Sequence, residues 1–214
     1  MPAPAPTSAD LDRVPPVGEH TTRNANTGDI EALATTLTLA FDDDPLTTWL
    51  FPDQAARRRK LPTFFRALLR AALPLGEVYT TDESRCAAIW NPPGTFPMGW
   101  RKDAQLGFTT ARLVGPRIVS CSRGLMYFAS HHPKEPHWYL QMLGTQPEWQ
   151  GKGAGSAILA PVLERCDRDG ARAYLESSKE QNIPFYKRHG FDVTQEINVP
   201  GGGPTVWAMW RDPR

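Results

Sequence analysis

Residues 137–159, which read HWYLQMLGTQPEWQGKGAGSAIL, decide the fold of this chain. The first nine residues favour a strand, whereas the residues after the glycines favour a helix. Gly151, Gly153 and Gly155 stand at the junction, and each costs roughly 1 kcal/mol relative to alanine inside a helix. The pattern therefore indicates a backbone that another group must approach closely.

Three kinds of glycine-rich site compete for this turn. A P-loop requires GxxxxGK followed by Ser or Thr, but Gln146 and Gly153 stand at two of the fixed positions, which excludes it. A dinucleotide fingerprint is disfavoured because the third glycine comes one position early. The third kind is a pyrophosphate cradle, in which the unpaired N–H groups and the dipole of a helix N-terminus bind the anion. A glycine-rich connection without a ligand remains an alternative.

Turn residues and hydrophobic periodicity along the chain predict a mixed α/β sheet. Two strands around the TDES turn at 81–84 indicate an antiparallel pair, and the strand–helix–strand order of 137–178 indicates a parallel pair. Thr27 is the expected N-cap of the first helix, and Pro62 is expected to kink or restart the second. The expected strands cover 19–26, 77–81, 85–91, 137–145, 172–178, 191–199 and 205–211. The expected helices cover 27–41, 54–73, 101–131 with a break near 115–116, 152–169 and 181–189.

The composition is that of an ordinary globular protein. The 214 residues are 40% hydrophobic and 22% charged, and the net charge of +1 gives no strong attraction to nucleic acid. No apolar run approaches the ~20 residues that span a membrane. We expect 1–18 to be a disordered tail without the features of a secretory signal, and 19–214 to be a single cytoplasmic domain. Cys86, Cys121 and Cys166 form no CxxC pair and are expected to be reduced.

A second segment, NIPFYKRHGF at 182–191, helps to identify the kind of site that the glycine turn forms. The pattern Gln150-x-x-Gly153-x-Gly155 after a strand resembles motif A of the GNAT superfamily of acetyl-CoA-dependent N-acetyltransferases, and the second segment resembles its motif B. Residues 131–211 are similar to the branch that contains puromycin N-acetyltransferase. The resemblance implies the GNAT fold, which is a mostly antiparallel central sheet with a parallel splay between strands 137–145 and 172–178, flanked by helices.

The resemblance also implies which residues bind acetyl-CoA, the expected co-substrate. Backbone groups near Leu143 and Thr145 would pair with the pantetheine arm and polarise the thioester. Tyr186 is the expected general acid for the CoA thiolate, and packing of its helix onto the sheet is the alternative. Asn182 would bind the pantetheine arm, cap the motif B helix, or both. The expected cofactor-binding residues are Leu143, Thr145, Gln150, Gly151, Lys152, Gly153, Ala154, Gly155, Ser156, Asn182 and Tyr186.

Two residues are candidates for the base that takes the proton of the amine. A simple alkylammonium has a pKa of about 10, so a proton acceptor is required. Glu176 stands on strand 172–178 beside the splay, where it is either the base or a structural partner of an arginine or a backbone donor. His137 belongs to the residue type that titrates near neutrality. In a regular strand His137 would share one face with Tyr139, Gln141, Leu143 and Thr145.

We therefore expect an enzyme that moves an acetyl group from acetyl-CoA to a primary amine by direct transfer in a ternary complex. A small molecule is the first choice of acceptor, and the acidic run 42–44 either attracts its cationic amine or is a solvated turn. No metal, nucleic acid or membrane is expected to take part, and the protein is expected to be a monomer or a homodimer. Two alternatives stay open: an acetyltransferase for protein amines, and a non-catalytic module that binds acyl-CoA for regulation.

Overall fold

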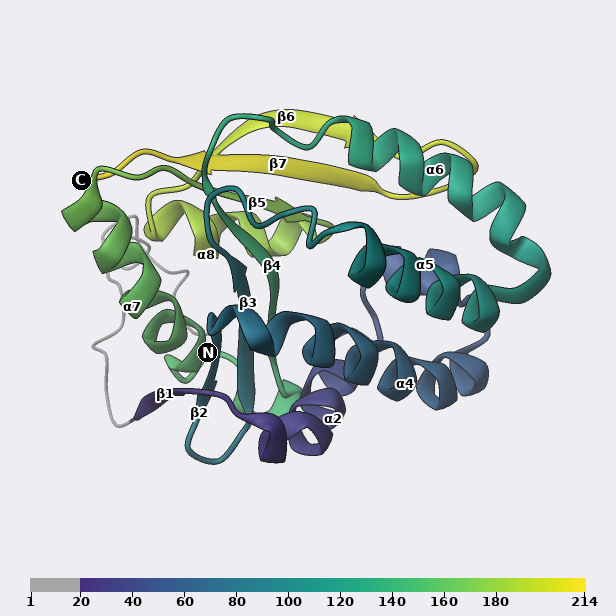
Figure 1. The fold of residues 1–214 in the computed structure, drawn as a ribbon, viewed down its shortest axis with the longest axis horizontal. Coiled ribbons are helices and arrows are strands. Elements are labelled where there is room, and N and C mark those ends of the chain that lie inside the picture. The colour runs from purple at the N-terminus through teal and green to yellow at the C-terminus, as the bar shows by residue number, and fades with distance from the viewer. Residues whose placement is uncertain (1–19) are drawn as a thin grey trace, which may run out of the picture.

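The computed structural model describes residues 20–214, which form one seven-stranded sheet in the order β1-β2-β3-β4-β5-β7-β6 (Figure 1). Neighbouring strands are antiparallel except β4 and β5, which are parallel. The mixed sheet and its parallel pair are therefore confirmed, whereas the expected tail 1–18 lies outside the described residues. The strands are β1 (Thr22–Asn24), β2 (Val78–Thr81), β3 (Cys86–Asn91), β4 (Trp138–Thr145), β5 (Ala173–Ser177), β6 (Asp192–Asn198) and β7 (Thr205–Arg211).

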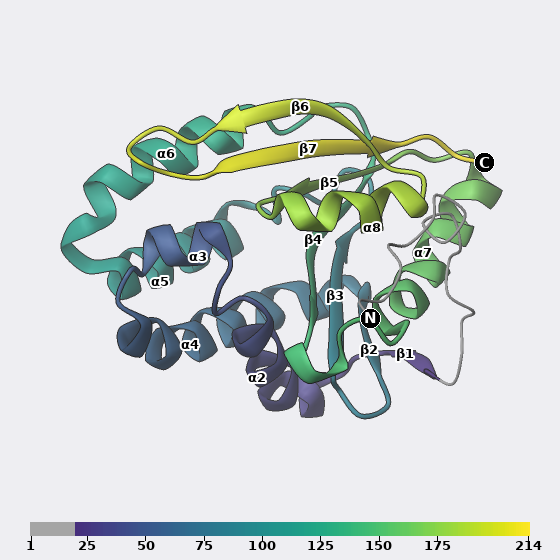
Figure 2. The ribbon, with the colours of Figure 1, turned by 180° about the vertical axis from the view of Figure 1, so that it is seen from behind.

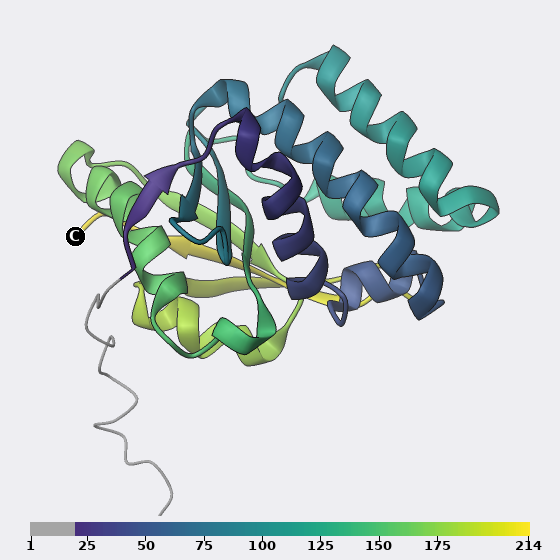
Figure 3. The same cartoon turned by 90° about the horizontal axis from the view of Figure 1, so that it is seen from below.

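Helices cover both faces of the sheet (Figures 2 and 3). The helices are α2 (Ile30–Ala40), α3 (Pro45–Leu50), α4 (Gln54–Ala72), α5 (Trp100–Val114), α6 (Ile118–Ser130), α7 (Ala154–Asp169) and α8 (Ile183–Arg188), with 3-10 turns η1 (Thr27–Asp29), η2 (Leu73–Leu75), η3 (Gly115–Arg117), η4 (Pro147–Trp149) and η5 (Glu180–Asn182). Helices α2 to α6 pack on one face and share one hydrophobic core, while α7 and α8 pack on the other face over a second core. None of the helices in 20–214 is both long and apolar enough to cross a membrane.

Two local expectations about helices are corrected by the structure. The cap at the start of the first helical segment is Asn26 rather than Thr27, because Asn26 accepts from the N–H of Gly28 while Asp29 accepts from the N–H of Asn26. The restart that was one of the two possibilities at Pro62 is not observed, because α4 continues through this residue. The expected break near residue 115 is present, since Gly115 ends α5 with φ 72° and ψ −139°.

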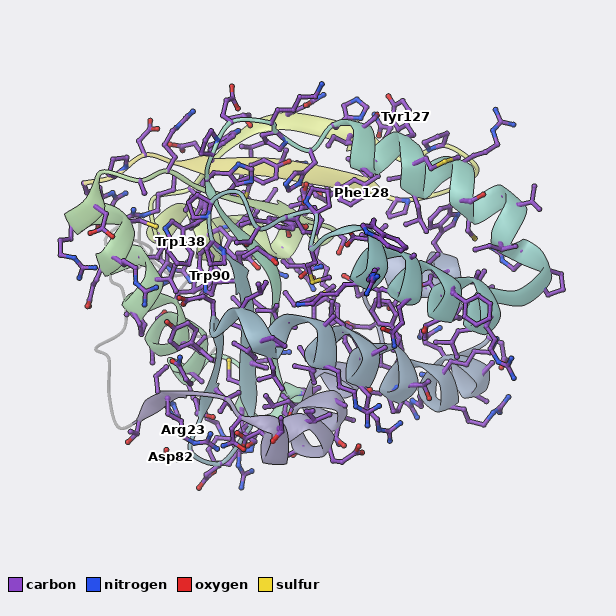
Figure 4. All side chains as sticks on the ribbon, in the orientation of Figure 1. Arg23, Asp82, Trp90, Tyr127, Phe128 and Trp138 are labelled. Carbon is purple, nitrogen blue, oxygen red and sulfur yellow. The ribbon has the colours of Figure 1, made fainter. Side chains whose placement is uncertain are left out.

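The neighbouring residues Tyr127 and Phe128 lie on opposite sides of α6 (Figure 4). On α6, Phe128 packs against the core while Tyr127 is 44% exposed. Trp90 of β3 and Trp138 of β4 belong to the core beneath α7. At the β1 edge of the sheet, Nε of Arg23 lies 3.8 Å from Oδ1 of Asp82. The hydrophobic periodicity of the sequence thus produces two separate cores, one on each face of the sheet.

A β-bulge interrupts β4 at Gln141. Leu140 pairs with Trp90 of β3 and Met142 pairs with Ile89, so Gln141 has no partner on β3. The side-chain amides of Asn91 and Gln141 are hydrogen-bonded at 3.1 Å beside the bulge. An extra residue of this kind reverses the alternation of side chains along a strand.

Because of the bulge, the expectation that β4 has a single polar face is wrong. Before it, Tyr139 faces the core beneath α2 to α6; after it, Leu143 packs against the core beneath α7. Thr145 follows Leu143 to that side, where its hydroxyl lies 3.1 Å from Sγ of Cys86. The five residues that were expected to share a face, and that the bulge divides, are His137, Tyr139, Gln141, Leu143 and Thr145.

Candidate active site

A cavity of about 340 Å³ lies where the end of β4 meets the start of α7 and the helix α8. Segments far apart in the sequence form its wall, because Phe41 and Asp44 at the α2–α3 connection also line it. Among the residues expected to bind the cofactor, Lys152 is not in the wall. Those that do line the cavity are Leu143, Thr145, Gln150, Gly151, Gly153, Ala154, Gly155, Ser156, Asn182 and Tyr186.

Strands β4 and β5 separate on the way to this cavity. They pair over three positions, which end at Leu140 opposite Leu175. Beyond that point β4 continues to Thr145 paired only with β3, and β5 continues to Ser177 paired only with β7. The inner edge of 141–145 therefore offers backbone groups to which an extended chain can pair as an added strand.

The start of α7 presents unpaired backbone donors to the cavity. The first intrahelical bond runs from the N–H of Ala157 to the carbonyl of Gly153. The N–H groups of Ala154, Gly155 and Ser156 consequently have no partner within the helix, and Gly153 at the N-cap has no side chain to cap them. These donors and the positive end of the helix dipole form an anion site.

The glycines of the turn are required for two different reasons. Gly151 and Gly153 have φ of 74° and 88°, a region that L side chains rarely adopt. Gly155 is helical, but a Cβ built on it would lie 3.2 Å from Cζ of Phe185 on α8. Backbone conformation thus explains the first two glycines, and contact with the next helix explains the third.

Two polar side chains of the turn serve its own structure. Gln150 donates through Nε2 to the carbonyl of Thr145 at 3.1 Å, which ties the turn to the end of β4. Nζ of Lys152 lies over the ring of Trp149, 4.6 Å from its centroid, and the guanidinium of Arg85 lies 3.9 Å from the same centroid. Lys152 therefore adds positive charge at the rim rather than a donor in the cavity wall.

Tyr186 reaches the cavity from α8 and is 8% exposed. Burial, together with the charges of Asp44 and Cys86, raises the pKa of its phenol well above 10. The phenol therefore stays protonated at neutral pH and is able to donate a proton to a more basic atom.

Asn182 stands at the start of α8 but does not cap it. Its φ of −86° and ψ of −15° are helical, because the chain enters α8 directly from η5, and its side chain makes no hydrogen bond to the first turn. The capping role, which was one of the two expected for Asn182, is not observed. Its amide lines the cavity instead.

Glu176 lies on the other face of the sheet, one residue beyond the last β4–β5 pair. Its side chain is 5% exposed, and its Oε1 lies 3.1 Å from Nδ1 of His132. The structural partner of Glu176 is therefore a histidine rather than an arginine. Sequence reasoning missed His132, because its segment HHPKEP reads as a proline-rich linker.

His137 lies at the opposite end of the paired segment from Glu176. It precedes the first β4–β5 pair, Trp138 opposite Ala173. Its Nδ1 lies 2.6 Å from the carbonyl of Glu135, and burial lowers its pKa despite this contact. The backbone of His137 thus lies at the end of the paired segment away from the splay, while its ring centroid lies 5.2 Å from that of His132.

The acidic run 42–44 is used within the fold. Asp42 is paired with Arg57 and Arg58, and Asp43 with Lys179. Asp44 is the N-cap of α3. Asp42 and Asp44 are thus largely buried, whereas Asp43 is 75% exposed, as the solvated-turn alternative expects.

The cavity residues fit a phosphate-bearing acyl carrier. Gly151 and the first residues of α7 line the same cavity, and a Cβ on Gly151 would meet no described atom within 4 Å. Lys152 and Arg188 add positive charge around it, Arg188 as part of the wall. The unpaired edge of β4 leads from this anion site towards Tyr186, as an extended arm joined to phosphates requires.

Comparison with known proteins agrees with this geometry. The family model described as the acetyltransferase (GNAT) family matches residues 62–191. An uncharacterised N-acetyltransferase of Schizosaccharomyces pombe is 26% identical over 184 residues, which are 79% of this chain and 73% of that protein. A structure of a histone acetyltransferase HPA2 and related acetyltransferase from Corynebacterium glutamicum has a TM-score of 0.68 at 24% identity, covering 91% of this chain and 97% of the other. A polyamine N-acetyltransferase of Drosophila melanogaster that forms N-acetylagmatine has a TM-score of 0.56 at 16% identity, covering 91% and 100%.

Proposed function

This chain belongs to the acetyltransferase (GNAT) family and is an N-acetyltransferase, and on that premise we propose that it acetylates a primary amine of a small molecule. The observation that carries the proposal is the cavity in which the free N–H groups of α7 and the phenol of Tyr186 meet the unpaired edge of β4. Enzymes of this family use acetyl-CoA as the acetyl donor. A polyamine is the acceptor named for the Drosophila protein that shares this fold, which supports a small amine here.

The residues of the cavity take the following parts in acetyl-CoA binding. The N–H groups of Ala154, Gly155 and Ser156 hold the pyrophosphate, and Lys152 adds charge at the rim. Backbone groups of Leu143 and Thr145 pair with the pantetheine arm and polarise the thioester oxygen. Asn182, which is not needed as a helix cap, hydrogen-bonds the same arm.

We propose direct transfer in a ternary complex, carried out by two groups on opposite faces of the sheet. Tyr186, on the α7 side, donates its proton to the departing thiolate. The proton of the amine is taken up on the Glu176 side, where the buried carboxylate attracts a cationic acceptor. In this proposal the amine attacks the thioester where β4 and β5 separate, and no acetylated enzyme forms as an intermediate.

We extend the proposal to the whole domain and to its branch of the family. Residues 19–214 are proposed to be a single catalytic domain, since one sheet and its two cores account for 20–214. We propose that 131–211 belongs to the branch that contains puromycin N-acetyltransferase, and amino-nucleosides are therefore among the first acceptors to test.

A thiol-release screen tests the proposal. Purified protein and acetyl-CoA are incubated with puromycin, agmatine, other small amines and lysine-containing peptides, and acetylated products are identified by mass. Thiol release with a small amine is the expected result. Release only with peptides would instead favour a protein acetyltransferase. A melting temperature raised by acetyl-CoA without any turnover would favour a regulatory acyl-CoA-binding module.

A further inference from the structure

His132 lies outside the motifs on which the proposed function depends, yet it belongs to a buried polar site. It follows α6 closely in the chain, and its side chain is 12% exposed. Its Nδ1 lies 3.1 Å from Oε1 of Glu176, whose side chain is 5% exposed. A buried imidazole–carboxylate pair therefore stands where β5 separates from β4.

The hydrogen bond to Glu176 determines the tautomer of His132. An ionised carboxylate can only accept, so Nδ1 carries a proton and donates it. Nε2 of the neutral ring is then a free lone pair. This atom is buried and has no hydrogen-bond partner within the described chain. A buried polar atom without a partner is costly, and a donor brought by a ligand would satisfy it.

Aromatic rings enclose this pair. The ring centroids of Phe96, Tyr139 and Tyr174 lie 4.7, 4.6 and 5.3 Å from that of His132. Aromatic faces beside a carboxylate attract an ammonium group. Phe96 is the one of the three rings that is not buried, so it forms the solvent-facing side of this enclosure.

The other titratable groups around His132 are less suited to accept a proton. Burial and the charge of Glu176 raise the pKa of both Tyr139 and Tyr174, so these phenols stay protonated. The ring of His137 lies 5.2 Å from that of His132, but at the end of the paired segment away from the splay. His132 is the imidazole that pairs directly with Glu176.

We infer that His132 takes the proton of the acceptor amine and that Glu176 is the residue that positions it, an inference that rests on the proposed N-acetyltransferase function. An N–H bond of the ammonium breaks and its proton passes to Nε2 of His132. The electron pair left on nitrogen attacks the acetyl carbonyl, the C–S bond breaks towards sulfur, and the sulfur takes the proton of Tyr186. The nitrogen then loses its second proton, which converts the Tyr186 phenolate back to the phenol, and the proton held by His132 passes to solvent. The acceptor is thus a cationic primary amine that binds on the α6 side of the sheet, opposite the α7 cradle.

The variant His132→Asn separates catalysis from structure. The Asn amide can stand where Nδ1 stands and still donate to Glu176, but it offers no basic nitrogen. With puromycin or agmatine as acceptor we expect kcat/KM to fall about 100-fold or more, and the fall of activity at acidic pH that histidine protonation causes to disappear. The acetyl-CoA-induced rise in melting temperature should remain. His131→Asn is the matched control and should behave as wild type, because the side chain of His131 hydrogen-bonds, among the described residues, only to Tyr127 and Ser130 of α6.

A purely structural His132 gives the opposite result. His132→Asn would then keep the wild-type kcat/KM and pH profile, and the inference would be overturned. Nitrogen-15 NMR of the wild type gives a readout independent of turnover: the His132 signals, identified by their loss in His132→Asn, should show Nδ1 protonated and Nε2 unprotonated, and the reverse tautomer would also overturn it. Failure of the proposed function itself is recognised separately, because the wild type would then release no thiol with any amine.

Discussion

Asp44 accepts a hydrogen bond from the hydroxyl of Ser178, which lies 134 residues later in the chain. The other carboxylate oxygen accepts from the N–H groups of Leu46 and Thr47 at the start of α3. Asp44 is 4% exposed, and burial raises its pKa above the ordinary value of 3.8. One buried carboxyl group therefore joins the first turn of α3 to the loop that leads into α8.

Replacing Asp44 by Asn should change how stability depends on pH. A carboxyl group whose pKa is raised by folding stabilises the protein most below its unfolded pKa of about 4, and this contribution is lost as pH rises through the folded pKa. The free energy of unfolding of the wild type minus that of Asp44→Asn should therefore fall as pH rises from about 4. Urea unfolding of both proteins across this range measures it, and a difference that grows with pH would contradict it.

The neighbouring Asp43→Asn is the control for this prediction. The side chain of Asp43 is 75% exposed and pairs with Lys179 at the surface. Loss of such a pair changes the free energy of unfolding by about 0–1 kcal/mol. Asp43→Asn should accordingly leave the pH dependence of the wild type in place.

Gly153→Val should abolish acetyl-CoA binding. The left-handed φ of 88° makes the substitution cost roughly 1–2 kcal/mol, and the new side chain would stand at the donors of α7. Gly170→Val is the matched control, because Gly170 caps the far end of the same helix with φ 63°. Both variants should lose stability, but only Gly153→Val should lose the acetyl-CoA-induced rise in melting temperature. If both keep that rise, the phosphates bind elsewhere.

Gly144→Ala should destabilise the protein by about 1–3 kcal/mol. A Cβ on Gly144 would lie 2.9 Å from Cβ of Ala40 and 3.0 Å from Cδ2 of Leu37, so α2 would have to move away from β4. Gly107→Ala in α5 is the contrasting variant, since a Cβ there meets no described atom within 4 Å. It should stabilise the protein by up to about 1 kcal/mol. Urea unfolding should therefore shift in opposite directions for the two variants.

The glycine turn could be predicted from the sequence because its signals are local. A strand pattern, three glycines and a helix pattern follow one another within 137–159, and Gly151 and Gly153 act through their own backbone conformation. The structure places Gly153 at the N-cap of α7 as this order implies, and Tyr186 in the same cavity. Strands β2 and β3 likewise lie within a residue of their expected bounds.

The bulge and the histidine pair could not be predicted because both depend on distant partners. The sequence around Gln141 does not indicate a bulge. The extra residue is defined only by the pairing of β4 with β3. His132 lies 44 residues from Glu176, in a segment whose prolines indicate a linker. Only the strand order brings them together, and a single shift at Gln141 was enough to misplace the polar face of β4.

Tyr186→Phe should lower kcat by about 100-fold or more while leaving acetyl-CoA affinity nearly unchanged, because only the proton for the thiolate is lost. Burial and the charge of Asp44 raise the pKa of Tyr186, so wild-type activity should show no loss from its ionisation up to about pH 10. Thiol-release kinetics measure both effects, with Tyr127→Phe on the exposed side of α6 as the control. If kcat is unchanged in Tyr186→Phe, then the role of Tyr186 is only to pack α8 against the sheet. The thiolate would then take its proton from another group.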